Sequence, residues 1–214
     1  MEAAKKKTNS TSYHHGDLRN ALIIAAAELI EESGSEDFAM IDAARRAGVS
    51  NAAPYRHFSD RDDLLQAVGE LGYYDLASAL NEISDQHEAG STEAIIALGK
   101  YYLGFVVSKK AFFNLMWGER GYQTLLNIED KQTKLRSNGF WLLVRHVEAW
   151  LARENVTDTN PADLALKMWA MSIGTAHMAL NYELDHFVEG IDLDEIVESS
   201  TLAFLQGIRG NRAD

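Results

Sequence analysis

The most informative part of this sequence lies at residues 38–58, which read FAMIDAARRAGVSNAAPYRHF. Two short helical patterns, at residues 40–47 and 51–58, flank a tight turn, AGVS at residues 47–50. The glycine permits the backbone conformation of such a turn, the valine is placed to pack beneath it, and the serine is placed to cap the next helix. Two short helices joined in this way have the geometry of a helix-turn-helix, whose second helix enters the major groove of DNA.

The composition of the rest of the chain indicates an ordinary globular protein built from helices. The chain has 214 residues, of which 46% are hydrophobic, enough for one large domain or two small ones. Only two prolines occur, and apolar residues recur at spacings of three and four, which predicts an all-α fold. One such helical face consists of Leu18, Leu22, Ala25, Ala26, Leu29 and Ile30.

Start and stop signals divide this pattern into individual helices. Gly34 is expected to end the first helix, and Ser59 with Asp62 has the spacing of a capping box. Asn160 before Pro161, and Asp192, are expected to cap two later helices. The predicted helices span residues 17–33, 40–47, 51–58, 61–86, 92–108, 109–117, 129–153, 162–184 and 193–208.

The net charge of −12 argues at first against nucleic acid, because contacts to phosphate need lysine and arginine. The charge is unevenly distributed, however. Residues 1–61 carry eight basic and nine acidic side chains, and residues 43–59 contain three arginines and no acid. The acidity therefore lies mostly downstream, and the region of the turn remains suited to DNA.

The stretch around the turn resembles the DNA-binding domain of the tetracycline-repressor (TetR) family of bacterial regulators. The family pattern is A-G-V-S, three variable residues, one further position and then Y-x-H-F, which this chain matches at residues 47–58. Residues 60–65, DRDDLL, follow where the family opens its fourth helix, and residues 13–19, YHHGDLR, are similar to the start of one subgroup. The resemblance is specific over residues 13–70 and only architectural beyond them.

The resemblance implies two domains in an all-α chain. After a flexible basic tail at residues 1–12, a three-helix helix-turn-helix DNA-binding domain is expected at residues 13–60. A helical ligand-binding and dimerisation bundle is expected at residues 61–214, with the fourth helix, about 61–86, connecting the two. Lys5, Lys6 and Lys7 in the tail fit either an arm that reaches the minor groove or a solubilising tail.

The resemblance also implies which residues contact DNA. It places Asn51, Ala52 and Ala53 at the variable positions that face the bases, where an asparagine can read adenine and an alanine methyl can contact that of thymine. Phe58 is expected in the core of the small domain. Phosphate contacts are implied for Tyr55, His57 and Arg61, with help from Ser50, and the further candidates for phosphate or base contacts are Arg45, Arg46 and Arg56.

Two positions depart from the family pattern. Ala39 stands where members usually have serine or threonine, which removes a helix cap worth about 0.5–2 kcal/mol. Ile41 stands where members often have a polar or basic residue, which removes an expected groove contact. Both changes affect the expected operator preference and leave the expectation of DNA binding in place.

Aromatic residues concentrate in the C-terminal part, where a pocket between helices would accept a small apolar or aromatic-compatible effector. Aromatic residues at helical spacing also fit an ordinary core, so both interpretations stay open. The candidate pocket residues are Tyr73, Tyr101, Tyr102, Phe105, Phe112, Phe113, Met116, Trp117, Trp141, His146 and Trp169.

The last two helices are those that TetR-like proteins use to form a homodimer, and a symmetric dimer predicts a palindromic operator. Their sequence here supports that role, because small and apolar residues share a face and permit close approach. The candidate interface residues are Met168, Met171, Gly174, Thr175, Met178, Tyr182, Ile196, Val197, Ala203 and Phe204.

Two alternatives compete with a ligand-responsive repressor. One is a TetR-like regulator that acts through a protein partner, and the other is an all-α enzyme that does not bind DNA. The enzyme is disfavoured because no His-Glu-x-x-His motif or nucleophile–base pattern occurs and no cysteine is present. No metal site or cofactor is expected, since the adjacent His14 and His15 do not share a helix face. No membrane span is expected either, and the predicted location is the cytoplasm.

Overall fold

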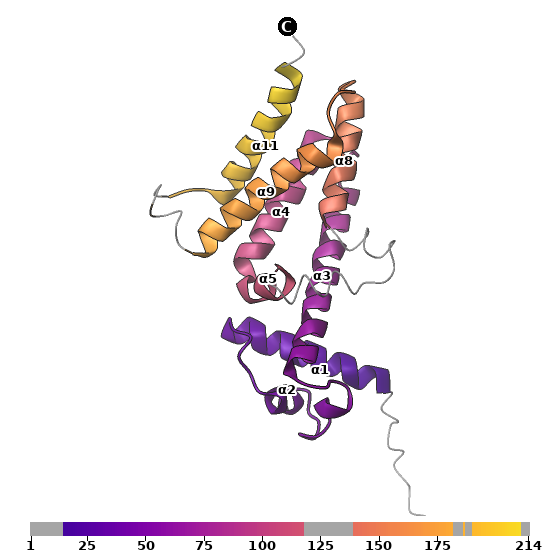
Figure 1. The fold of residues 1–214 in the computed structure, drawn as a ribbon, viewed down its shortest axis with the longest axis vertical. Coiled ribbons are helices and arrows are strands. Elements are labelled where there is room, and N and C mark those ends of the chain that lie inside the picture. The colour runs from indigo at the N-terminus through magenta and orange to yellow at the C-terminus, as the bar shows by residue number, and fades with distance from the viewer. Residues whose placement is uncertain (1–14, 118–138, 182–185, 187–189, 211–214) are drawn as a thin grey trace, which may run out of the picture. The chain divides into compact units, whose positions relative to one another are not determined.

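The computed structural model describes residues 15–117, 139–181, 186 and 190–210, which form helices and turns and no strand (Figure 1). The predicted all-α fold is therefore confirmed. The basic tail, Tyr182 and the first part of the predicted helix 129–153 lie outside the described residues. The elements are α1 (His15–Ser33), α2 (Met40–Arg46), the 3₁₀ helix η1 (Pro54–Arg56), α3 (Arg61–Asp85), α4 (Thr92–Ser108), α5 (Lys110–Trp117), α8 (Gly139–Arg153), α9 (Pro161–Leu180) and α11 (Leu193–Gly210).

The chain divides into two compact units, residues 1–68 and 69–214. The division falls inside α3, whereas the sequence placed the domain boundary at the start of this helix. The reason is that the first two turns of α3 bury Leu64, Leu65 and Val68 completely or almost completely, as part of the first unit.

In the first unit, the predicted turn between the two short helices is formed by a glycine with a positive φ. Gly48 has φ of +68°, and its N–H donates to the carbonyl of Arg45 over 3.2 Å. The N–H of Val49 donates to the carbonyl of Ala44 over 3.0 Å, which completes a Schellman motif at the end of α2. Two otherwise unpaired helix carbonyls are thus satisfied within the turn.

The segment after this turn differs from the predicted helix at residues 51–58. Residues 51–53 form a turn, and η1 is a single 3₁₀ turn in which the N–H of His57 donates to the carbonyl of Pro54. Pro54 has no N–H, and the hydrogen bonds of Ala53, Arg56 and His57 all span three residues. The segment is therefore wound more tightly than an α-helix.

Helix caps in the first unit also differ in detail from the prediction. The carboxylate of Asp60 accepts the N–H of Asp63 over 2.9 Å, and that of Asp63 accepts the N–H of Ser59, also over 2.9 Å. Hence the α3 cap uses Asp60 and Asp63 in place of the predicted Ser59 and Asp62. At α2, the carboxylate of Asp42 accepts the N–H of Ala39, so half of a capping box survives the loss of a polar cap residue.

The second unit packs α4, α8, α9 and α11 against one another (Figure 1). The predicted caps are confirmed at α9, where the side chain of Asn160 accepts two N–H groups, and at α11, where Asp192 does the same. None of the described helices combines the length and the apolar character that a membrane crossing needs. The core comprises Ile95, Val144, Val147, Trp150, Leu151, Val156, Leu164, Ala165, Met168 and Leu205.

Candidate nucleic-acid interface and cavity

The segment that follows the α2 turn presents a set of exposed side chains. Asn51, Ala52 and Arg56 are exposed, and the ring of Tyr55 is 59% exposed, which is unusual for a large aromatic residue. Pro54, within the same segment, is buried. Backbone turns fixed at both ends thus hold these side chains outward.

Two other residues of this segment are placed differently. Ala53, which the sequence assigned to the bases, is buried in the core, so its methyl group does not face outward. Phe58 is 2% exposed, as expected for a core residue, and the guanidinium of Arg19 lies 5.1 Å from the centre of its ring.

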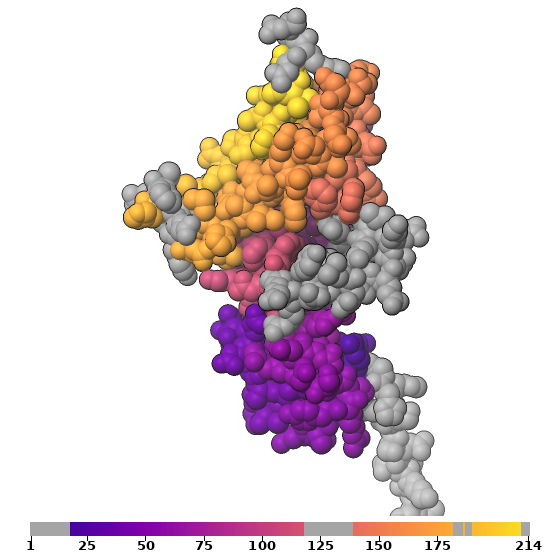
Figure 2. Space-filling model, in the orientation of Figure 1, coloured from indigo at the N-terminus to yellow at the C-terminus, as the bar shows by residue number. Residues whose placement is uncertain are grey.

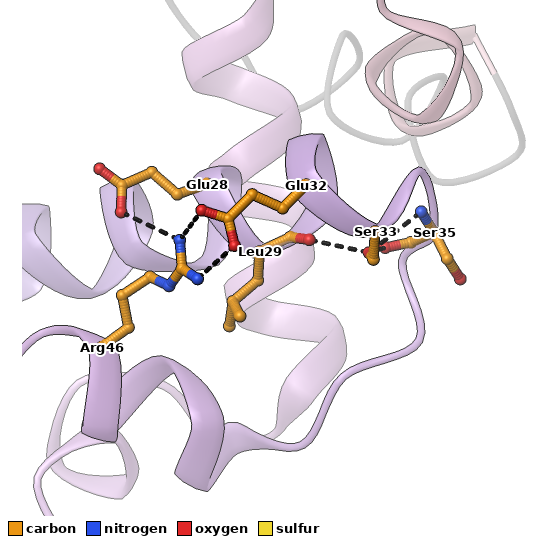
Figure 3. Close-up of polar contacts among 6 residues, drawn as sticks. All are labelled: Glu28, Leu29, Glu32, Ser33, Ser35 and Arg46. Carbon is orange, nitrogen blue, oxygen red and sulfur yellow. Dashed lines mark hydrogen bonds and ion pairs between the residues drawn. The ribbon is translucent and has the colours of Figure 1, made fainter.

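The neighbouring arginines Arg45 and Arg46 have different surroundings. The side chain of Arg45 is 71% exposed, and among the described residues its ion pair is with Asp42 of its own helix, over 2.9 Å. Arg46 is 28% exposed and points at α1, where it donates to both carboxylate oxygens of Glu32 and to Glu28 (Figure 3). The hydrogen bonds from Arg46 lower the pKa of the Glu32 carboxyl group. Arg46, a predicted phosphate contact, therefore joins α1 to α2.

Arg61, another predicted phosphate contact, is also engaged within the first unit. Its guanidinium donates to the carbonyl of Glu36 and lies 4.0 Å from the carboxylate of Asp37. It also lies 5.8 Å from the centre of the Phe38 ring. Arg61 consequently connects the segment between α1 and α2 to the start of α3.

Two further predicted phosphate contacts differ in exposure. Ser50 is exposed, whereas His57 is half-buried.

Residues 22–68 match the model of the tetR family of bacterial regulatory proteins. This range runs from α1 into α3 and contains all the predicted base and phosphate contacts outside the N-terminal tail. This part of the chain is thus similar to the tetR family of bacterial regulatory proteins. A DNA-binding regulator is the class of protein that this match supports.

Solved structures extend the likeness in fold to nearly the whole chain. A Rhodococcus protein of unknown function is 29% identical, with a TM-score of 0.73, over 92% of this chain and 98% of that one. A TetR/AcrR-family transcriptional regulator from Thermobifida fusca is 21% identical, with a TM-score of 0.62, over 89% and 98%. RolR in complex with resorcinol is 19% identical, with a TM-score of 0.60, over 90% and 93%. None of the curated proteins compared with the chain matches it.

A cavity of about 40 Å³, partly open to solvent, lies within the second unit. Of the predicted pocket residues, Tyr102 and Trp169 line it. The small and hydroxyl-bearing residues of the lining were not predicted from the sequence. Ser172 and Thr201 could have been found, because they are polar positions on otherwise apolar helix faces. The full lining is Leu80, Ile95, Leu98, Gly99, Tyr102, Gly139, Leu143, Met168, Trp169, Ser172 and Thr201.

The other predicted pocket residues lie elsewhere. Trp117 is the centre of an aromatic cluster, with ring centres 5.5 Å from Tyr73, 5.8 Å from Tyr102 and 5.2 Å from Phe113. This cluster joins α3, α4 and α5, and only Tyr102 belongs to both cluster and cavity. The predicted residues that do not line the cavity are Tyr73, Tyr101, Phe105, Phe112, Phe113, Met116, Trp117, Trp141 and His146.

His146 is a buried structural residue of α8. Its Nδ1 accepts the N–H of Gly90 over 3.4 Å, and its Nε2 lies 2.8 Å from the hydroxyl of Ser84. Burial, and then the nearby Arg145 and His87, lower the pKa of the His146 imidazole. The neutral ring therefore links the end of α3 and the loop before α4 to α8.

This arrangement predicts that the second unit loses stability on acidification. Because the folded-state pKa of His146 lies below the ordinary value of 6.5, the unfolded chain binds more protons once the pH falls to that value. The free energy of unfolding should thus decrease as the pH falls from 6.5 towards the folded pKa. Urea unfolding across this window should show a steeper loss for the wild type than for His146→Gln; equal slopes would contradict the assignment.

The outer faces of α9 and α11 form a continuous surface in Figure 2, where the two helices lie side by side. Among the predicted dimer residues, Gly174 and Ala203 are exposed. Met168 and Val197 are buried in the core of the unit, so they do not belong to this surface. The half-buried members of the predicted set are Met171, Thr175, Met178, Ile196 and Phe204.

Proposed function

We propose that this TetR-family regulator is a ligand-responsive repressor that binds a palindromic operator as a homodimer in the cytoplasm. The observation that carries the proposal is the exposed set Asn51, Ala52, Tyr55 and Arg56 on a rigid turn of the DNA-binding unit. An exposed tyrosine beside an arginine serves recognition better than stability, because neither side chain adds to the core.

Roles within this interface follow from exposure and charge. Asn51 and Ala52 are the residues proposed to face the bases, through an amide that can pair with adenine and a methyl group that can meet thymine. Ser50, Tyr55, Arg56 and His57 are proposed to hold the phosphates. Arg45 joins them, whereas Ala53, Arg46 and Arg61 are left out because they have structural roles.

Arg45 and Arg46 provide a matched test of these roles. Arg45→Ala should weaken DNA binding uniformly across sequences and reduce the slope of log affinity against log salt by about 1. Arg46→Ala should leave that slope unchanged and lower the melting temperature of the first unit, because the links to Glu28 and Glu32 are lost. DNA titrations at several salt concentrations, with melting curves for both variants, would reveal a reversal of these effects.

The proposed homodimer would use the joint surface of α9 and α11. Small exposed residues such as Gly174 and Ala203 permit close approach of two copies of these helices. A two-fold dimer would present two reading units to half-sites about 34–36 Å apart, or a multiple of this distance. This spacing is the reason to expect a palindromic operator.

The proposed ligand response rests on the cavity of the second unit. RolR, which shares the fold, was solved with resorcinol, so a small aromatic molecule is a reasonable effector class here. An effector changes DNA affinity only to the extent that it binds one conformation of the dimer better than the other.

The experiment that tests the proposed function is selection of bound fragments from the genomic DNA of the source organism at about 50 and 200 mM salt. We expect a recovered palindrome at the lower salt, with affinity that falls by orders of magnitude at the higher salt. Absence of binding at both concentrations would favour the alternative in which the chain acts through a protein partner.

A further inference from the structure

The cavity of the second unit is neutral wherever the described residues line it. Its walls are formed by aliphatic, aromatic and glycine residues, with hydroxyl groups from Tyr102, Ser172 and Thr201. No aspartate, glutamate, lysine, arginine or histidine belongs to this lining. A charged ligand would therefore lose its hydration without gaining a counter-charge from these walls.

The hydroxyl oxygen of Tyr102 is a buried polar atom of this lining. Tyr102 is 7% exposed, and its hydroxyl makes no hydrogen bond with the described residues. Tyr73, at the other side of the aromatic cluster, provides the contrast, because its hydroxyl donates to the carbonyl of Met116. A buried hydroxyl without a partner costs about 1–3 kcal/mol, so Tyr102 requires an explanation that Tyr73 does not.

The surroundings of Tyr102 indicate what its hydroxyl can offer. Burial raises the pKa of the phenol, and the adjacent Trp169 indole opposes this rise more weakly. An indole N–H can only donate, so the proton of Tyr102 is left to be donated to something else. Ser172 already donates its own proton to the carbonyl of Met168 over 3.1 Å, whereas the buried hydroxyl of Tyr102 has its proton available for a ligand.

We propose that this cavity binds a small, neutral, mainly apolar molecule whose carbonyl or similar oxygen accepts the hydrogen bond of Tyr102. The apolar walls would hold the body of the molecule, and the Tyr102 hydroxyl would fix its orientation. This proposal rests on the proposed ligand-responsive function and names the chemistry of its effector.

The test uses three probes that differ only in their polar group: acetophenone, ethylbenzene and benzoate. Calorimetric titration of the full-length protein should show acetophenone binding about 10-fold more tightly than ethylbenzene, with benzoate weaker than both. In Tyr102→Phe the preference for acetophenone over ethylbenzene should disappear. Ser172→Ala is the matched control and should keep the preference, because its hydroxyl proton is already engaged.

Several outcomes would overturn the proposal. They are equal affinity for acetophenone and ethylbenzene, tighter binding of benzoate, an unchanged preference in Tyr102→Phe, or no binding of any probe. Tyr102→Phe should fold at least as stably as the wild type, because it removes a hydroxyl without a partner, whereas Tyr73→Phe should melt lower. Melting curves of both variants check this expectation.

A measurement on the wild type removes the dependence on any variant. Acetophenone labelled with ¹³C at the carbonyl should show a lower infrared stretching frequency when bound than in an apolar solvent, because it accepts a hydrogen bond. An unshifted carbonyl would overturn the proposal. Binding of acetophenone by a protein that recovers no genomic DNA would instead contradict the proposed regulatory function and leave the assignment of the cavity intact.

Discussion

Alanine in place of Tyr55 should weaken binding to the operator by about 10- to 100-fold, the loss expected for a hydrogen bond to a charged phosphate and its supporting contacts. The ring is 59% exposed and adds little to the core, so the melting temperature of the protein should stay close to that of the wild type. Titration of a selected operator fragment, with melting curves alongside, would measure both quantities.

Two controls separate the causes of this loss. Tyr55→Phe keeps the ring and removes only the hydroxyl, so a similar loss would assign the contact to the oxygen. Tyr74→Ala removes another exposed tyrosine, 51% exposed, from the second unit and should leave DNA affinity unchanged. If Tyr55→Ala bound the operator as tightly as the wild type, the proposed phosphate contact would be wrong.

Alanine in place of Gly90 should lower the free energy of unfolding of the second unit by about 3 kcal/mol or more. Gly90 has φ of +72°, and an added Cβ would stand 2.6 Å from the backbone carbonyl carbon of Ala149 and the nitrogen of Trp150. Backbone atoms inside α8 cannot move away as the end of a flexible side chain can. The substitution should also disturb the hydrogen bond from the Gly90 N–H to His146.

Gly190 is the matched control in the same unit. It also has φ of +72°, but an added Cβ would meet no atom of the described residues within 4 Å. Gly190→Ala should therefore cost only the strain of the left-handed conformation, about 1–2 kcal/mol. Urea unfolding of both variants measures the difference, and equal losses would mean that the close approach to α8 is not the main cause.

Features that depend only on residues close together in the sequence were predictable from it. The turn at Gly48 was one, because a glycine after a short helix can take the positive φ that a Schellman motif requires. The caps at Asn160 and Asp192 were others, because each side chain bonds to N–H groups only two and three residues ahead. Where the sequence offered two adjacent acids for one cap, at Asp62 and Asp63, the spacing alone selected the wrong one.

The sequence was enough to predict which segment forms the candidate DNA interface, but not which of its side chains are exposed. The sequence placed Arg45 and Arg46 together, yet only the packing of α2 on α1 brings Arg46 to Glu28 and Glu32 (Figure 3). It likewise gave no sign that Arg61 would be held by the carbonyl of Glu36. The local sequence does not distinguish an exposed arginine from one that is ion-paired to another helix.

The local chemistry of the chain was thus enough to predict its helices and its tight turn, since hydrogen bonds over two to five residues control them. The cavity was decided only by tertiary structure. Its walls come from five helices, and a stripe of aromatic residues does not reveal which of them face empty space. Tyr102 lines the cavity while Tyr73 bonds to Met116, because the positions of distant helices determine which hydroxyl finds a partner.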